Sequence, residues 1–219
     1  MPPEVLQDEE VRALLAACGG APTGLRHQAL IALLYRAGLR IGEALALHPR
    51  DLNLATGEIR ILHGKGDRFR IAGIDPGAAA MIEAWMRIRA RMTTSRPVAL
   101  QPSHAAHSST AAARDGSASR GAPLPSSAPL ICTREGGRLS DAFVRRLMKR
   151  LAAKAGLDRR VHAHGLRHTH AAQLRAEGVD IGIISKQLGH RSILTTIRYL
   201  DHIAPVQVVN AMRGREWEG

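Results

Sequence analysis

The sequence predicts a mainly α-helical domain that carries one small antiparallel β-hairpin. Most apolar residues recur at intervals of three and four, as they do on one face of a helix. One segment, residues 57–74, alternates apolar and polar residues instead, which is the pattern of strands. Aromatic residues make up only 3% of the chain, which favours helices packed through Ala, Leu and Ile.

The first part of the chain predicts three helices. "LQDEEVRALLAAC" (6–18) places acidic residues before an apolar i, i+3, i+4 pattern, as is typical of a helix N-terminus. "GLRHQALIALLYRAG" (24–38) is a more apolar helix that ends at Gly38. "RIGEALAL" (40–47) is a short helix, and Pro49 prevents it from continuing.

The alternating segment predicts the hairpin. Ile59 and Ile61 alternate with polar residues, "GKGD" supplies the turn, and Phe69 and Ile71 resume the alternation. Lys65 therefore lies at the tip of the predicted hairpin.

Residues 75–92 predict a helix with Pro at its first position, and residues 95–129 differ from the rest of the chain. The latter stretch is rich in Ser, Ala and Pro without a periodic apolar pattern, so we expect a disordered insertion. "LICT" (130–133) follows as a short strand.

The last part of the chain returns to the helical period. "SDAFVRRLMKRLAAKAG" (140–156) is a capped helix that ends at a glycine. The further predicted helices are "HAHGLRHTHAAQLRAEG" (162–178), "DIGIISKQLGH" (180–190), "ILTTIRYLDH" (193–202) and a tail helix "APVQVVNAM" (204–212).

The charge of the chain indicates a polyanionic partner. The 219 residues carry a formal net charge of +12, and a protein that neutralises phosphates releases condensed counterions. An Arg-rich codon bias is the alternative source of this charge, because only four residues are lysine. The two cysteines fit neither a metal spacing nor a disulfide framework. Without a secretory leader or a membrane-length apolar run, we expect a cytoplasmic protein.

The stretch "HAHGLRHTH" (162–170) contains four histidines and one arginine. A zinc site would pair His164 with His168 one helical turn apart, but the stretch lacks the Glu of HExxH and holds no Cys or carboxylate. Arg167 lies on the same predicted helix face, and a guanidinium matches phosphate oxygens. The alternative that we favour is half of a phosphate clamp, in which His162 and His170 are peripheral.

Five motifs in a fixed order carry a resemblance to a known family: "LLYRAGLRIGEALAL", "HGKGDRFR", "HGLRHTHAA", "LGHRS" and "TTIRYLDH". Together they resemble the catalytic domain of the tyrosine recombinases, the phage-integrase family, with its Xer-type and integron-integrase members. The resemblance runs from about residue 4 to residue 205 and is interrupted by residues 95–129.

The resemblance assigns the catalytic and supporting residues. The catalytic residues that it implies are Arg40, Lys65, His164, Arg167, His190 and the nucleophile Tyr199. The supporting residues are Glu43, which orients Arg40, and His168.

The implied activity is site-specific recombination of double-stranded DNA. Tyr199 attacks a DNA phosphodiester and forms a 3′-phosphotyrosine intermediate, with no cofactor, no metal ion and no ATP. The resemblance also implies a homotetramer on two DNA sites, with exchange of a C-terminal helix and possible accessory DNA-bending proteins. No membrane partner is expected.

We expect residues 1–219 to form a single catalytic domain without the usual N-terminal core-binding clamp domain. That expectation leaves two alternatives open: a truncated recombinase that acts mainly as a DNA-binding module, and topoisomerase-like relaxation of DNA by the same chemistry.

Overall fold

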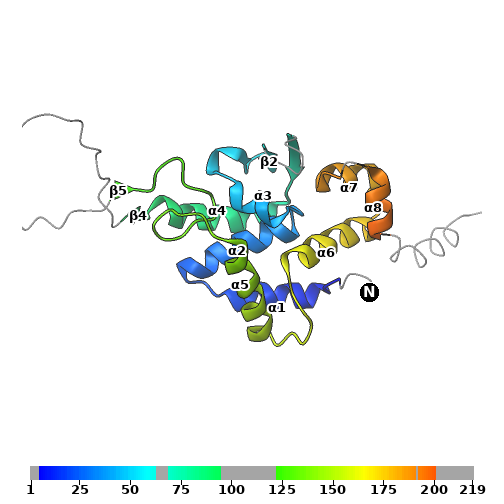
Figure 1. The fold of residues 1–219 in the computed structure, drawn as a ribbon, viewed down its shortest axis with the longest axis horizontal. Helices are drawn as coiled ribbons and strands as arrows, with labels where there is room; N and C mark the ends of the chain where they lie inside the picture. Colours follow the sequence, from blue (N-terminus) through cyan, green and yellow to red (C-terminus); the bar gives the residue numbers. More distant parts are fainter. Residues whose placement is uncertain (1–4, 63–68, 95–121, 191, 201–219) are drawn as a thin grey trace, which may run out of the picture.

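The computed structural model describes residues 5–62, 69–94, 122–190 and 192–200 (Figure 1). The helices are α1 (Asp8–Cys18), α2 (Pro22–Tyr35), α3 (Ile41–Ala46), α4 (Pro76–Ala90), α5 (Asp141–Lys154), α6 (Ala163–Ala176), α7 (Ile181–Leu188) and α8 (Ile193–Leu200), with a 3₁₀ turn at Pro49–Asp51. The strands are β1 (Leu52–Asn53), β2 (Glu58–Ile61), β3 (Arg70–Gly73), β4 (Thr93–Thr94) and β5 (Ala122–Pro123). Helices dominate and β1–β3 form a small antiparallel sheet, so the predicted fold class is confirmed.

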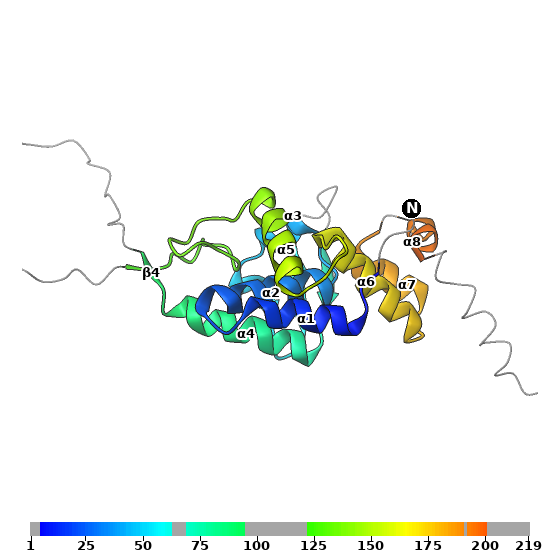
Figure 2. The same cartoon turned by 90° about the horizontal axis from the view of Figure 1, so that it is seen from below.

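Helix α2 lies at the centre of the molecule (Figures 1 and 2). Its residues from Ala29 to Tyr35 are all buried, because the segment is apolar on every side and α1, α4 and α6 pack around it. The backbone after α2 turns at Gly38, whose φ of +63° is a conformation that glycine adopts without strain. This turn leads directly into α3, which begins beside the candidate site.

The hairpin pairs β2 with β3 in the register Ile59↔Ala72 and Ile61↔Arg70, and β1 adds a third strand that the sequence did not predict. Ile59 and Ile61 are buried as the alternation indicates. On β3 the alternation identifies the strand but not its buried face. Phe69 and Ile71 are 59% and 50% exposed, and the inward positions belong to Arg70 and Ala72. A shift of one residue exchanges the faces of a strand, and here a polar contact decides the choice.

Residues 122–129, the last part of the insertion predicted at 95–129, have defined contacts in the structure. β5 pairs with β4, and Arg89 donates hydrogen bonds to the carbonyls of Ala128 and Pro129. Residues 95–121 lie outside the described residues, so their disorder stays a prediction. The predicted strand 130–133 is wrong: this segment forms only an isolated bridge, between Cys132 and Arg138. The Trp85 indole and the Leu47 carbonyl hold its backbone at Leu130 instead.

Helix α6 leads from the centre of the molecule to the end where α7 and α8 lie (Figures 1 and 2). Ala171, Ile184 and Leu188 form a small separate core between α6 and α7. The Asp180 carboxylate caps the start of α7, and Gly189 ends it in the left-handed conformation. Helix α8 packs on both α6 and α7. The predicted tail helix at 204–212 lies outside the described residues.

Candidate active site

Arg40 and Glu43 form the first part of the site at the start of α3. Arg40 is the residue before the helix, and the Glu43 carboxylate accepts hydrogen bonds from its backbone N–H at 2.9 Å and from its Nη1 at 2.8 Å. Because the Glu43 side chain is only 4% exposed, water screens this ion pair weakly. Glu43 therefore fixes both the backbone and the guanidinium of Arg40.

Arg167 reaches the same place from α6. Its Nη1 donates to the carbonyl of Gly38 and its Nη2 to the carbonyl of Leu188, both at 2.5 Å. Arg40 Nη2 donates to the carbonyl of Gly189 at 3.2 Å. Leu188 and Gly189 are consecutive, so two arginines from distant segments meet at the C-terminal end of α7. The negative end of the helix dipole favours cations at this position.

Arg167 is more deeply buried than the two histidines of the predicted helix face. The residue is only 2% exposed, whereas His164 lies at the surface and His168 is half-buried. The rings of His164 and His168 are 4.4 Å apart in an edge-to-face arrangement. The three residues lie in the N-terminal half of α6, and the carbonyls of Gly38 and Leu188 hold the guanidinium.

The electrostatic environment of the site favours the neutral state of His190 and His164. Burial, followed by the charges of Arg167 and Arg40, lowers the pKa of His190 to about 4. Partial burial of the ring, and then Arg167, also lower the pKa of His164. His190 follows the Gly189 cap, and its Nδ1 lies 2.8 Å from Thr196 Oγ1, a buried hydroxyl of α8. His190 thus lies between Arg40 and Arg167 on one side and the helix that contains Tyr199 on the other.

Two predicted residues are located only through their elements. Lys65 lies outside the described residues, between β2 and β3. The backbone of Tyr199 belongs to α8, but its side chain lies outside the description. The structure therefore brings together Arg40, Glu43, His164, Arg167, His168 and His190, and it places the helix of Tyr199 against α6 and α7.

Arg70 belongs to the site although the sequence analysis missed it. Its Nη1 and Nη2 donate to Glu43 Oε1 and Oε2, both at 2.8 Å. Burial by itself raises the pKa of Glu43, but the hydrogen bonds from Arg70 and Arg40 lower it to about 2. The signal in the sequence was the position of this arginine two residues before Ala72, because residues two apart on a strand share one face.

His162 and His170, which the sequence analysis places at the periphery, both have structural contacts. His162 caps α6, because its Nδ1 accepts the backbone N–H of Gly165 at 2.6 Å. His170 is only 6% exposed and is therefore part of the packed interior. A Cβ on Gly38 would lie 2.5 Å from the His170 ring, which shows how closely the ring packs against this turn.

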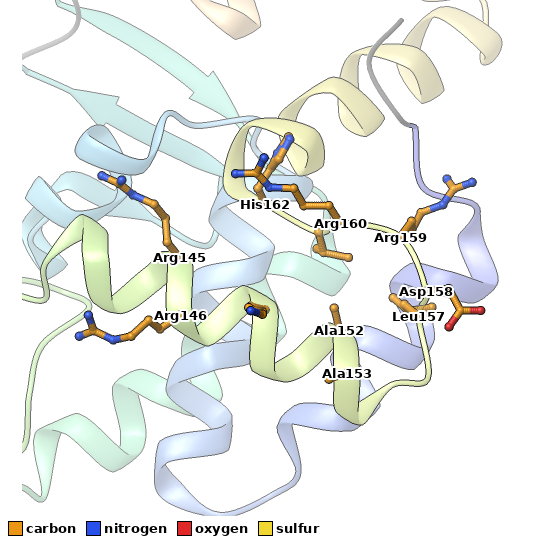
Figure 3. Close-up of a pocket in the computed structure, with 11 residues that line it drawn as sticks. Arg145, Arg146, Ala152, Ala153, Leu157, Asp158, Arg159, Arg160 and His162 are labelled. Atoms are coloured by element: carbon orange, nitrogen blue, oxygen red, sulfur yellow. The ribbon is translucent and has the colours of Figure 1, made fainter. Parts of the chain in front are cut away.

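A basic cavity of about 660 Å³ lies between α5 and the segment that leads into α6 (Figure 3). The cationic and histidine side chains that line it are Arg145, Arg146, Lys149, Arg159, Arg160 and His162, and Asp158 is the acidic residue among them. Arg159 is turned towards α1, where its Nε lies 3.2 Å from Glu10. The remaining cations form a positive surface beside the start of α6.

The part of the chain that the structure describes lacks the features of a metal site and of a membrane span. Within it, no three His, Cys, Asp or Glu side chains are grouped so that they could hold a metal ion. None of the described helices has the length and apolarity needed to cross a bilayer.

Comparisons with known proteins identify the family and the fold. Residues 4–204 match the Phage integrase family. The chain is 31% identical to tyrosine recombinase XerC of Xanthomonas campestris pv. campestris (strain B100), over 93% of this chain and 54% of that protein. The chain thus spans about half the length of the curated relatives that it matches.

Two solved structures have a similar fold. The crystal structure of XerA recombinase superposes with a TM-score of 0.74 at 23% identity and covers 99% of this chain and 67% of its own. The XerH site-specific recombinase, bound to its palindromic difH substrate in a post-cleavage complex, gives a TM-score of 0.68 at 25% identity and covers 97% and 53%.

Proposed function

Because the chain belongs to the phage integrase family, we propose that it is the catalytic part of a site-specific DNA recombinase. In the proposed reaction, the Tyr199 oxygen attacks a backbone phosphorus of double-stranded DNA. An O–P bond forms to the tyrosine while the bond from phosphorus to the 5′-oxygen breaks, which leaves a 3′-phosphotyrosine and a 5′-hydroxyl. A 5′-hydroxyl from another strand reverses the step and rejoins DNA without ATP.

The observation that carries this proposal is the meeting of Arg40 and Arg167 at the C-terminal end of α7, next to the helix of Tyr199. Only about one phenol in a thousand is ionised at neutral pH, which is a handicap of roughly 4 kcal/mol. Fixed cations offset such a handicap when they stabilise the charge that develops on the pentacoordinate phosphorus. The backbone carbonyls and Glu43 hold the two guanidiniums before DNA arrives, so little reorganisation is needed.

The histidines and Lys65 complete the proton transfers. His164 accepts the phenolic proton, and its lowered pKa favours the unprotonated state that a general base needs. Lys65 gives a proton to the departing 5′-oxygen. His190 is neutral and offers a hydrogen bond to a phosphate oxygen without adding charge, while His168 supports His164.

DNA is the proposed partner, and the cavity beside α6 supports this choice. Arg145, Lys149 and Arg160 line a surface that is continuous with the capping residue His162. Phosphate contacts of this kind position a protein on a duplex without reading its sequence. The XerH relative was solved bound to its difH substrate. We propose in addition that the protein acts as a homotetramer on two DNA sites in the cytoplasm, where accessory DNA-bending proteins assist.

Trapping on a nicked suicide substrate tests the proposal. The nick lets the short fragment that carries the new 5′-hydroxyl diffuse away. The reverse reaction then lacks its nucleophile, so the covalent protein–DNA adduct accumulates. We expect an adduct with the full chain, none with Tyr199→Phe, and a normal adduct with Tyr35→Phe, which alters the other tyrosine of the sequence. An equal adduct from Tyr199→Phe contradicts the assignment of the nucleophile.

The same assays separate the alternatives. Salt-sensitive DNA binding without any adduct indicates a binding module. Relaxation of supercoiled plasmid without recombinant products indicates a topoisomerase-like activity. Recombinant products from two sites indicate strand exchange.

A further inference from the structure

Arg70 occupies the inward position of β3, where a buried apolar side chain is the usual occupant. Its side chain is 13% exposed, and both of its terminal nitrogens bind the Glu43 carboxylate. Such a bidentate pair is stronger and more directional than a single charged hydrogen bond. The hairpin is therefore attached to the start of α3 through a rigid polar contact.

Arg70 also packs against the cap of α7. A Cβ on Gly189 would lie 2.6 Å from Arg70 Nε and 2.8 Å from its Cζ. Only a glycine leaves room for the guanidinium at this place, and the glycine adopts a φ of +64°. The carbonyl of the same glycine accepts from Arg40, and His190 is the next residue. Arg70 thus supports the backbone at Gly189, which binds Arg40 and precedes His190.

The arrangement around Glu43 explains why two arginines are needed. A carboxylate has room for several donors, and Arg70 and Arg40 both bind Glu43 Oε1 at 2.8 Å. If Arg70 were absent, Glu43 would keep Arg40 but lose its own fixed orientation. Arg70 also adds a positive charge that, after burial, Arg167 and Arg40, lowers the pKa of His190.

We propose that Arg70 is a positioning residue, which sets Arg40 and His190 relative to each other by bracing Glu43 and Gly189. This inference rests on the proposed function for its effect on rate, but the geometry that it describes does not. Arg70 acts through its neighbours, so its loss changes the cleavage step more than the binding of DNA.

The test compares Arg70→Met with Arg70→Lys, which keeps the charge but lacks the planar fork. The matched control is Arg60→Met, an exposed arginine on the neighbouring strand β2. Three quantities are measured for each full-length variant: the rate of adduct formation at saturating suicide substrate, the Kd for intact DNA, and the melting temperature.

We expect Arg70→Met to form the adduct about 100-fold more slowly, because misplaced catalytic groups cost rates of that order. Arg70→Lys should lie between this variant and the unaltered chain. Arg60→Met should react normally, and the Kd should stay within about twofold for all variants. Glu43→Gln combined with Arg70→Met should be no slower than the slower single variant, since both act through one contact.

A normal rate for Arg70→Met overturns the inference. So does a rate loss matched by an equal loss of DNA affinity, which identifies a DNA contact instead, or a loss fully explained by the fraction of unfolded protein. If Arg70→Met does not fold, Arg70→Lys alone decides.

A second readout needs no activity. NMR titration should show a higher pKa for both Glu43 and His190 in Arg70→Met, which removes the charge, with shifted amide signals at Gly189 and His190. If the unaltered chain forms no adduct, the proposed function fails, and this readout decides the inference. Unchanged signals then overturn it.

Discussion

Glu43 is the residue that connects most of the site, because its carboxylate binds Arg40 and Arg70 at the same time. The family resemblance predicts its contact with Arg40, which lies three residues earlier in the chain. The contact with Arg70 joins two segments that only the fold brings together. A buried carboxylate between two cations is stabilised by both, and removing it leaves both charges without their main partner.

Replacing Glu43 with Gln should lower the free energy of unfolding by about 3 kcal/mol, since breaking a buried ion pair leaves a charge uncompensated. Chemical denaturation at pH 7 measures this change. Glu83→Gln, on the exposed face of α4, is the matched control and should change stability by less than about 0.5 kcal/mol.

The same substitution has a defined pH dependence. The pKa of Glu43 is about 2 in the folded state and 4.5 in its ordinary environment. The unfolded chain therefore binds more protons between these values, and the stabilisation is present above pH 4.5 and lost as the pH falls towards 2. The difference between Glu43 and Gln should be constant from pH 5 to 7. A difference that grows on acidification would contradict the ion-pair geometry.

At the scale of elements, the site depends on where helices end. The C-terminus of α7 supplies the carbonyls of Leu188 and Gly189 to two arginines, and its cap directs the chain into His190. The turn at Gly38 supplies the third carbonyl. These glycines have positive φ values of +64° and +63°, so the backbone at both places needs a residue without a Cβ.

Gly189→Ala tests this dependence against Gly156→Ala. Both glycines have a similar positive φ, so alanine costs each about 1–2 kcal/mol of backbone strain. A Cβ at Gly156 meets nothing within 4 Å, whereas one at Gly189 meets the Arg70 side chain. We expect Gly189→Ala to lose more stability and to slow adduct formation, while Gly156→Ala loses stability alone. Equal effects on the rate would show that the α7 cap does not position the site.

At the scale of the whole molecule, the chain combines a net positive charge with buried or half-buried histidines that are neutral. Burial and nearby arginines lower the pKa of His27, His170 and His190 to about 4. The folded chain already carries a formal net charge of +12 at pH 7. Acidification therefore adds positive charge to a molecule that already carries an excess of it.

We expect the free energy of unfolding to fall as the pH drops from 6.5 towards 4. In this window the unfolded chain binds protons that the folded chain excludes, so each such histidine costs up to about 1.4 kcal/mol per pH unit. Urea denaturation at pH 7, 6 and 5 measures the slope. His170→Phe should reduce it by about one histidine's contribution. An identical slope for this variant would show that His170 is protonated in the folded state.

The basic cavity predicts how DNA binding responds to salt. Arg145→Ala should reduce the slope of log K against log[salt] by about 0.9, the contribution of one phosphate contact. Arg87→Ala removes the same charge from an exposed position on α4 and should leave the slope unchanged. Equal reductions in both variants would indicate that net charge, rather than this surface, controls binding.

The sequence by itself determined the helices, the hairpin and the family. Apolar residues at intervals of three and four mark α1 and α5, because one face of each must be buried, and a continuous apolar run marks the central helix α2. The cap residues Asp180 and Gly189 mark α7. The resemblance carried by the five ordered motifs implies six candidate catalytic positions, because each motif is a short segment that can be recognised in the sequence. These features are local, so they can be read from short segments.

Tertiary structure alone decided which face of β3 is buried, that Arg70 joins the site and that Arg167 is held by the carbonyls of Gly38 and Leu188. Periodicity favours Phe69 and Ile71 as the buried residues, but the Glu43 carboxylate stabilises an inward arginine instead. The sequence does not contain this preference, because the free energy of a buried charge depends on a partner supplied by another element. The physical reason is that ion pairs and backbone hydrogen bonds across the fold form only once the helices and strands have packed.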